Sequence, residues 1–255
     1  MALSIYLSSV LDVMEDLTFC IPYYGKEQHH TKLLELCIRQ IRRFYPTHRI
    51  LVCKTTDSYM PPDLPSNIEI FNTFVDGSHV IGAIELLIRE CKTTHFLLCH
   101  DSMFMMKALP DQTNIPYYSL WHFFDCRDDY PVMRCVRNDS LITEHNHIEH
   151  MYQHQYNIQW AGIFGPAFGG TMAMLQEFWK TLHISTDNIQ PYLGREGLMM
   201  CERYFPLVIT YLGYNTLSSL NGSIFNQPGC FEVTEITHLD SMEYKNFFYK
   251  IWQRR

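Results

Sequence analysis

A polar triplet interrupts one of the most apolar parts of the chain. The run 96–99 (FLLC) leads into His100, Asp101 and Ser102, and the run 103–106 (MFMM) follows at once. A short apolar run is typical of a buried strand, and a carboxylate beside it is costly to bury unless it is paired or binds a metal. Ligands bind at the carboxyl ends of strands in open α/β sheets. We therefore expect Asp101 to bind a ligand; the alternative is that it caps a turn.

A second carboxylate is predicted on an apolar helix face. Four residues of the helix-like segment 194–212 recur at spacings of three and four and so share one face: Leu198, Glu202, Phe205 and Ile209. Apolar surroundings raise the pKa of a carboxyl towards neutrality, which suits a general base. We predict that Glu202 takes a proton from a substrate hydroxyl. The alternatives are an arginine partner, an exposed position, or Glu196 in the helix's first turn as the base.

Two turns that follow predicted strands carry side chains suited to a nucleotide. Pro22, Tyr23 and Tyr24 follow the strand 17–21, where a tyrosine can stack on a base. Thr55 and Asp57 follow the strand 49–53 and can hydrogen-bond to ribose or uracil. Tyrosines packed into the domain and an ordinary turn at Asp57 are the alternatives. The absence of GxxxxGK[ST] and GxGxxG disfavours P-loop and dinucleotide sites.

The order of the segments predicts an α/β fold. Strand-like runs at 17–21, 49–53, 68–71 and 96–99 alternate with helix-like segments at 26–44 and 80–92, which indicates a mostly parallel sheet flanked by helices. Further helices are expected at 175–182, at 194–212 with a kink or break at Pro206, and at 244–252. With 255 residues and no linker we expect one domain, with a nucleotide-binding half at about 17–107 and an acceptor half at about 108–255.

Composition narrows the function classes. The chain is 47% hydrophobic and carries a net charge of -7, which disfavours disorder and a nucleic-acid partner. Its nine cysteines include no CxxC pair, which indicates a reducing compartment. Acidic residues appear too early in the first 16 residues for a signal peptide, and no apolar run approaches the ~18 residues of a membrane helix. We expect a cytoplasmic protein without a transmembrane segment.

Taken in order, five segments resemble the GT-A-fold glycosyltransferases, in particular small members from bacteria and large DNA viruses. They are LTFCIPYYG, RILVCKTTDS, THFLLCHDSMFM, WAGIFGPAFGG and REGLMMCERYF, which together lie within 17–212. The resemblance implies a Rossmann-like GT-A domain. It also implies that a sugar passes from a nucleoside-diphosphate donor, such as a UDP- or GDP-sugar, to a hydroxyl of a glycan or glycoprotein acceptor.

The resemblance also implies roles for individual residues. THFLLCHDSMFM stands where the family has an Asp-x-Asp motif, which implies Mn²⁺ or Mg²⁺ at Asp101 with His100 beside it. This chain offers one carboxylate where two are usual. One carboxylate with diphosphate oxygens and water can suffice; alternatively, basic residues neutralise the diphosphate without a metal. An acidic residue on a late helix implies that Glu202 is the base of an inverting transfer, or a sugar ligand if the configuration is retained.

The glycine- and aromatic-rich segment 160–170 resembles the family's sugar and acceptor side. This implies contacts from Trp160, Gly162 and Phe164, with Glu196 on the same side; a tight buried turn is the alternative. Two other function classes stay open: a sugar nucleotidyltransferase, and a non-catalytic glycan- or nucleotide-binding protein. The sequence gives less support to a zinc site formed by His147, His150 and His154, because the motif HExxH is absent.

Overall fold

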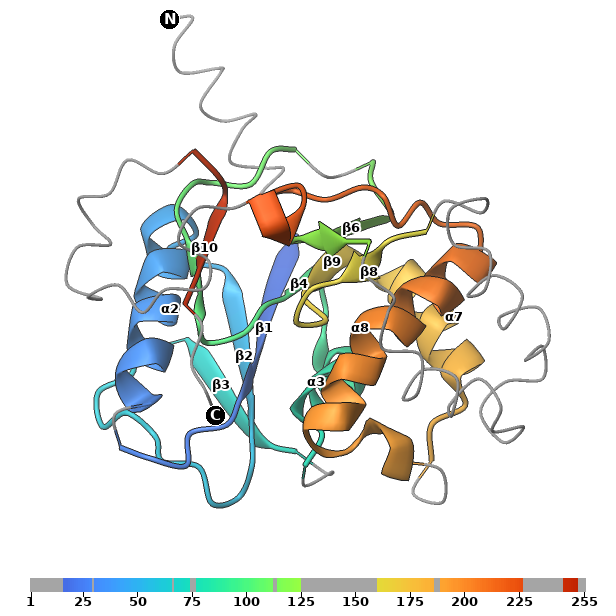
Figure 1. The fold of residues 1–255 in the computed structure, drawn as a ribbon. Coiled ribbons are helices and arrows are strands. Elements are labelled where there is room, and N and C mark those ends of the chain that lie inside the picture. Colours follow the sequence, from blue (N-terminus) through green and yellow to red (C-terminus); the bar gives the residue numbers. More distant parts are fainter. Residues whose placement is uncertain are drawn as a thin grey trace, which may run out of the picture.

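A six-stranded sheet forms the centre of the molecule (Figure 1). The computed structural model describes residues 16–28, 30–65, 67–73, 77–111, 114–124, 160–185, 189–226 and 245–251. The strand order is β3 (Ile68–Asn72), β2 (Arg49–Lys54), β1 (Leu17–Tyr23), β4 (His95–Leu98), β9 (Phe168–Thr171) and β6 (Tyr117–Ser119). The first four strands run parallel, and β9 pairs antiparallel with both β4 and β6.

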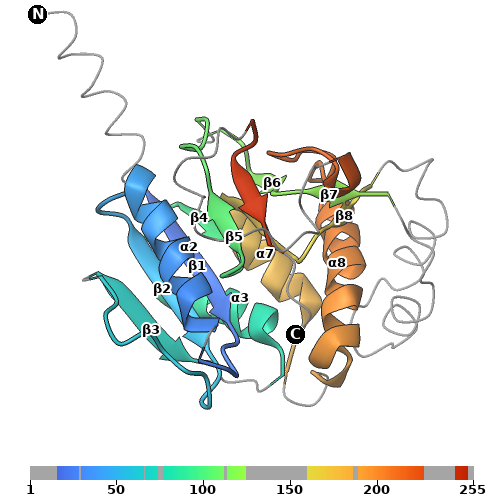
Figure 2. The same cartoon turned by 60° about the vertical axis from the view of Figure 1, so that its left-hand side comes forward.

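Helices cover both faces of this sheet because its central strands are apolar on both sides. Alternate strand residues such as Phe19, Ile21 and Ile50 pack against α2 (His30–Phe44). Their neighbours Cys20 and Leu51 face α3 (His79–Glu90), α7 (Met172–Leu182) and α8 (Gly194–Tyr211). Figure 2 shows α2 on one side of the sheet and α8 on the other. Continuous apolar strands of this kind are expected in a sheet buried on both faces.

Two small sheets extend the structure beside the carboxyl ends of the central strands. β5 (Met103–Met105) pairs antiparallel with β10 (Phe248–Lys250), and β7 (His122–Phe123) pairs with β8 (Gly162–Ile163). Two 3-10 helices, η1 (Gln190–Tyr192) and η2 (Ile224–Asn226), lie in the connections. The β5–β10 pairing brings residues from the far end of the chain against the segment that directly follows β4.

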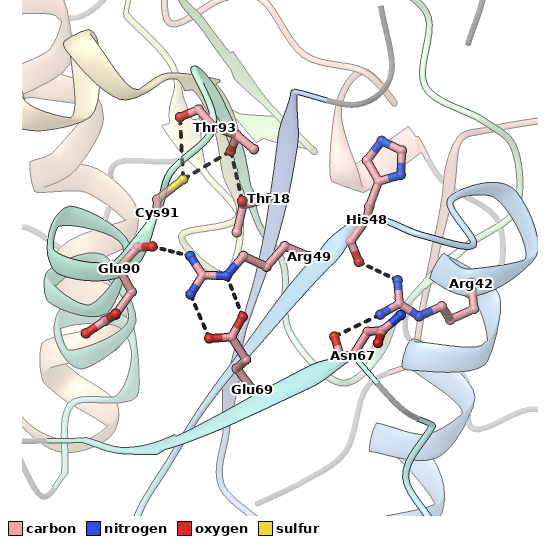
Figure 3. Close-up of polar contacts among 9 residues, drawn as sticks. All are labelled: Thr18, Arg42, His48, Arg49, Asn67, Glu69, Glu90, Cys91 and Thr93. Carbon is pink, nitrogen blue, oxygen red and sulfur yellow. Dashed lines mark hydrogen bonds and ion pairs between the residues drawn. The ribbon is translucent and has the colours of Figure 1, made fainter. Parts of the chain in front are cut away.

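At the opposite end of the central sheet, where its parallel strands begin, two arginines form several hydrogen bonds (Figure 3). Arg49, at the start of β2, forms a two-point ion pair with Glu69 of β3, at 2.5 and 2.7 Å, and donates to the Glu90 carbonyl at the end of α3. Arg42 of α2 donates to the carbonyls of His48 and Asn67. A planar guanidinium suits such multiple contacts. Polar bonds therefore hold the strands together at their amino ends, the ends opposite the polar turns that follow β1 and β4 in the chain.

The predicted α/β architecture with a mostly parallel, helix-flanked sheet is confirmed, whereas its GT-A identity stays a prediction. The helix predicted at 194–212 is confirmed as α8, and Pro206 lies inside it without dividing it. The helix predicted at 244–252 is wrong, because β10 occupies Phe248–Lys250. In β10 the pairing with β5 outweighs the local helical pattern. Within the described ranges no helix has the length and hydropathy needed to cross a membrane.

Candidate functional site

The turn that follows β4 carries the polar triplet at the carboxyl edge of the sheet. The Cys99 amide donates to the Cys20 carbonyl at 3.1 Å, and the Met103 amide donates to the His100 carbonyl at 2.9 Å, which closes the turn. The Asp101 residue is only 3% exposed, and Ser102 is also buried. The predicted position of Asp101 at the end of a buried strand is confirmed; the ligand that it was predicted to bind stays a prediction.

Glu202 lies beside this turn. Its Oε1 accepts a hydrogen bond from the backbone N–H of Gly165 at 2.9 Å. Gly165 has a φ of +60°, and a Cβ built on it would lie 3.1 Å from the Met103 Cε and 3.8 Å from the His100 Nε2. One glycine therefore contacts the Glu202 carboxyl on one side and faces the strand-end turn on the other. The two carboxylates singled out in the sequence, 101 residues apart in the chain, lie in one region.

Burial raises the pKa of Glu202 to about 7 from an ordinary value of 4.5, although three neighbours oppose the rise. These are the Gly165 N–H, then the charges of Arg203 and Lys250. The Arg203 Nη1 is 3.7 Å from the Glu202 Oε2, longer than a hydrogen bond, and it donates instead to the Met199 carbonyl at 3.0 Å. Arg203 therefore contributes charge to Glu202 without neutralising it in a close pair. A carboxyl that titrates near neutral pH is suited to exchange a proton with a substrate.

A lysine absent from the sequence-based predictions completes this region. The Lys250 Nζ donates a hydrogen bond to the Ser102 Oγ, and the next amide, of Ile251, donates to the Ser102 carbonyl at 3.0 Å. We call His100, Asp101, Ser102, Gly165, Glu202 and Lys250 the strand-end site. The sequence gives no local signal for Lys250, because a strand pairing across almost 150 residues brings it there.

The strand-end turn offers a metal one carboxylate, from Asp101, and one imidazole, from His100. Over the described ranges, no three His, Cys, Asp or Glu side chains form a group that could hold a metal ion. These two donors would need the remaining ligands to come from a substrate and water. The predicted Mn²⁺ or Mg²⁺ stays a prediction, and the zinc candidates His147, His150 and His154 lie outside the described residues.

The predicted nucleotide side forms a second group at the same edge. Tyr24 stacks on the His79 ring, with centroids 4.4 Å apart, and the Lys26 Nζ lies 4.7 Å from the centre of the Tyr24 ring. Lys26 also pairs with Asp57 at 3.8 Å. Hydrogen bonding from Thr55, more than the nearby lysine charges, lowers the pKa of Asp57. The turns after β1 and β2 are thus joined through their side chains.

Backbone bonds join the same two turns. The Tyr59 amide donates to the Gly25 carbonyl at 2.8 Å, and the Gly25 amide donates to the Ser58 Oγ at 3.3 Å. The Tyr59 side chain is 55% exposed on this surface. Tyr59 and His79 were missed in the sequence, because neither follows a strand directly and only the folded turns bring them near Tyr24.

Several predicted binding residues belong to the core instead. Tyr23 is fully buried on the α2 side and donates to the Tyr59 carbonyl, so its ring is not available to a base. Pro22 is a buried residue of β1. Trp160 is fully buried in the core cluster that includes residues of α3, α7 and α8, and a Cβ at Gly162 would meet the Phe123 ring at 2.4 Å. These positions fit the packing alternatives rather than ligand contact.

Two other sugar-side candidates differ in position. Phe164 is half-buried next to Gly165, with its ring edge-on to Trp121 at 6.5 Å. Glu196 is exposed in the first turn of α8. Of the two acids on this helix, Glu202 is thus the one beside the strand-end turn.

Comparison with protein-family models gives no match, and no curated protein is similar to the chain at a significant level. Function is therefore inferred from the residues at the carboxyl ends of the strands.

Proposed function

We propose that this protein is a glycosyltransferase that moves a sugar from a nucleoside-diphosphate donor to a hydroxyl acceptor. The single observation that carries the proposal is the approach of Glu202 to the strand-end turn through Gly165. A transferase of this kind needs a base for the acceptor hydroxyl beside the reacting sugar. It also needs polar groups for the donor at the carboxyl edge of the sheet. Glu202 and Asp101 supply these in one region.

In the proposed reaction the Glu202 carboxylate takes the proton of the acceptor hydroxyl. The hydroxyl oxygen forms a bond to the anomeric carbon of the donor sugar. The bond from that carbon to the diphosphate oxygen breaks, and the nucleoside diphosphate leaves with the bonding electron pair. Attack from the side opposite the leaving group inverts the configuration. The Glu202 side chain is only 16% exposed, so little water competes for its proton.

Asp101 and the two joined turns bind the donor in this proposal. The Asp101 carboxylate can accept hydrogen bonds from the hydroxyls of the donor sugar. Tyr24, which stacks on His79 and lies under the Lys26 ammonium group, has an aromatic ring of the kind that stacks on a base. Asp57 can accept hydrogen bonds from ribose. The strand-end turn supplies one carboxylate and one imidazole, so the predicted metal needs a phosphate of the donor as a further ligand. The proton transfer and the bond changes of the proposed reaction do not depend on that metal.

Donor binding can be tested by thermal unfolding in the presence of UDP-, GDP- and dTDP-sugars, with and without Mn²⁺. A ligand at 100 times its dissociation constant stabilises a protein by about 2.7 kcal/mol, a clear shift. We expect one donor to raise the unfolding temperature of the wild type and of Glu202→Gln. No shift with any donor would contradict the proposal. Binding without transfer to any acceptor would instead favour a non-catalytic binding protein. Release of inorganic diphosphate from a nucleoside triphosphate and a sugar 1-phosphate would favour a nucleotidyltransferase.

A further inference from the structure

The last described strand of the chain is fixed firmly beside the strand-end turn. β10 pairs with β5 from Phe248 to Lys250. The Asn221 Oδ1 accepts from the amides of Phe247 and Phe248 at 2.9 and 3.3 Å, and the Met106 amide donates to the Phe247 carbonyl at 2.8 Å. Side chains on such a strand are held in register. The position of Lys250 is therefore determined by backbone bonds rather than by its own flexible stem.

Lys250 directs its ammonium group to the strand-end turn. Its Nζ donates a hydrogen bond to the Ser102 Oγ, which orients the ammonium group toward this turn. The Lys250 charge lowers the pKa of the Glu202 carboxyl and the pKa of the Cys37 thiol. The Asp101 charge raises the pKa of the same thiol. The ammonium group of Lys250 therefore lies within electrostatic range of Glu202, and it acts on the same Cys37 thiol as Asp101. It is a cation at the point where a donor would place its diphosphate.

A nucleoside diphosphate brings negative charge to a site that already contains Asp101 and Glu202. This charge must be balanced, and it grows on the leaving oxygen as the sugar–oxygen bond breaks. An ammonium group forms charge-assisted hydrogen bonds to phosphate oxygens. On the basis of the glycosyltransferase function proposed above, we infer that Lys250 binds the diphosphate group of the donor. It fills the position that a metal and a second carboxylate would otherwise occupy.

Binding of inorganic diphosphate and of UDP, measured by titration calorimetry in the presence of EDTA, tests this inference. Lys250→Gln keeps a donor for Ser102 but removes the charge. We expect both anions to bind the wild type and to bind Lys250→Gln about 10- to 100-fold more weakly, the effect of losing one charged hydrogen bond. Uridine, which lacks phosphate, should bind both proteins equally if it binds. Raising the salt concentration should weaken diphosphate binding to the wild type.

Lys245→Gln is the matched control, because it makes the same charge change at an exposed position in the same terminal segment. We expect its affinity for diphosphate to equal that of the wild type. Lys250→Met, of similar length, replaces Lys250→Gln if the glutamine variant does not fold. Equal affinity of the wild type and the Lys250 variant would overturn the inference. So would binding that appears only when Mn²⁺ replaces EDTA.

These outcomes are separate from those of the proposed function. Diphosphate binding that depends on Lys250, without sugar transfer from any donor, would support the Lys250 site and contradict the transferase. Sugar transfer that Lys250→Gln leaves unchanged would support the transferase and overturn the role of Lys250.

Discussion

The Glu202 carboxyl accepts a hydrogen bond from the Gly165 backbone N–H, at 2.9 Å, beside the turn that ends β4. This contact joins the middle of α8 to the loop between β8 and β9. It keeps a buried acid at a fixed position relative to Asp101. Burial raises the pKa of this carboxyl to about 7, although the Gly165 N–H and the charges of Arg203 and Lys250 oppose the rise.

Glu202→Gln should change how stability depends on pH. In the folded protein this carboxyl takes up its proton near pH 7, whereas an ordinary glutamate does so near 4.5. Between these values the folded state binds more protons than the unfolded chain, so the free energy of unfolding falls as pH rises. This rise in pKa, from 4.5 to about 7, corresponds to a change of about 3 kcal/mol in the free energy of unfolding. Glutamine does not titrate and can still accept from Gly165.

Urea unfolding at pH 4.5, 6 and 8 measures this difference. We expect the variant to gain stability relative to the wild type as pH rises, with most of the change complete by pH 8. A constant difference between the two proteins across this range would show that Glu202 titrates normally and is not the neutral-pH acid described above.

Gly165→Ala should damage the site more than its cost in stability suggests. At a φ of +60° an alanine is strained by about 1–2 kcal/mol. Its methyl group would also lie 3.1 Å from the Met103 Cε. Gly213→Ala is the control, since Gly213 has a φ of +87° and open space around its Cβ position. Both variants should lose similar stability in urea, but only Gly165→Ala should lower donor turnover. Equal turnover would mean that Gly165 does not position Glu202.

Much of the fold could be predicted from local patterns. Apolar runs such as 17–21 and the helical spacing in α2 and α3 identify the central sheet and its first helices, although β1 continues through Pro22 to Tyr23. The spacing around Glu202 also placed that acid on a buried helix face. These features depend on neighbours within one or two turns, so a single sequence records them.

Other parts depend on long-range contacts that a single sequence does not record. Lys250 reaches the site only because β10 pairs with β5. Tyr23 and Tyr24 are adjacent in the chain, yet Tyr23 lies in the core whereas Tyr24 stacks on His79, because β1 ends at Tyr23 and Tyr24 lies beyond it. Trp160 was expected to contact a sugar because its segment resembles the sugar side of the family, whereas the structure buries it fully in the apolar core.

Arg49 and Glu69 should show measurable coupling in a double-mutant cycle. Their two-point pair joins β2 to β3 at the amino edge (Figure 3). Partial exposure of Glu69 limits the expected coupling to about 1 kcal/mol. The exposed helix pair Glu85 and Arg89 is the control, with about 0.3–0.5 kcal/mol expected. Arg49→Gln and Glu69→Gln, singly and together, measured in urea, give the value. Coupling no larger than the control would mean that this edge is held by other contacts.

His48→Phe should make the protein less sensitive to acid. His48 is buried edge-on against Tyr45, 4.9 Å between ring centroids, and neither of its ring nitrogens has a hydrogen-bond partner among the described residues. Burial, with the Arg42 charge, lowers its pKa below the ordinary 6.5. The unfolded chain therefore takes up this proton first, and stability falls as pH drops below about 6.5. Phenylalanine should reduce that fall, as seen by comparing unfolding temperatures at pH 5 and pH 8. The same fall in both proteins would rule out His48 as its source.

The most direct measurement is the release of nucleoside diphosphate from a panel of UDP-, GDP- and dTDP-sugars at pH 8. Water can replace the acceptor hydroxyl, so release is measurable before the acceptor is known. We predict release by the wild type from at least one donor, and a loss of roughly 100-fold or more in Glu202→Gln, the usual scale for removing a general base. Glu177→Gln, an exposed change on α7, should release at the wild-type rate. No release from any donor, or equal rates in the wild type and Glu202→Gln, would contradict the proposed transferase.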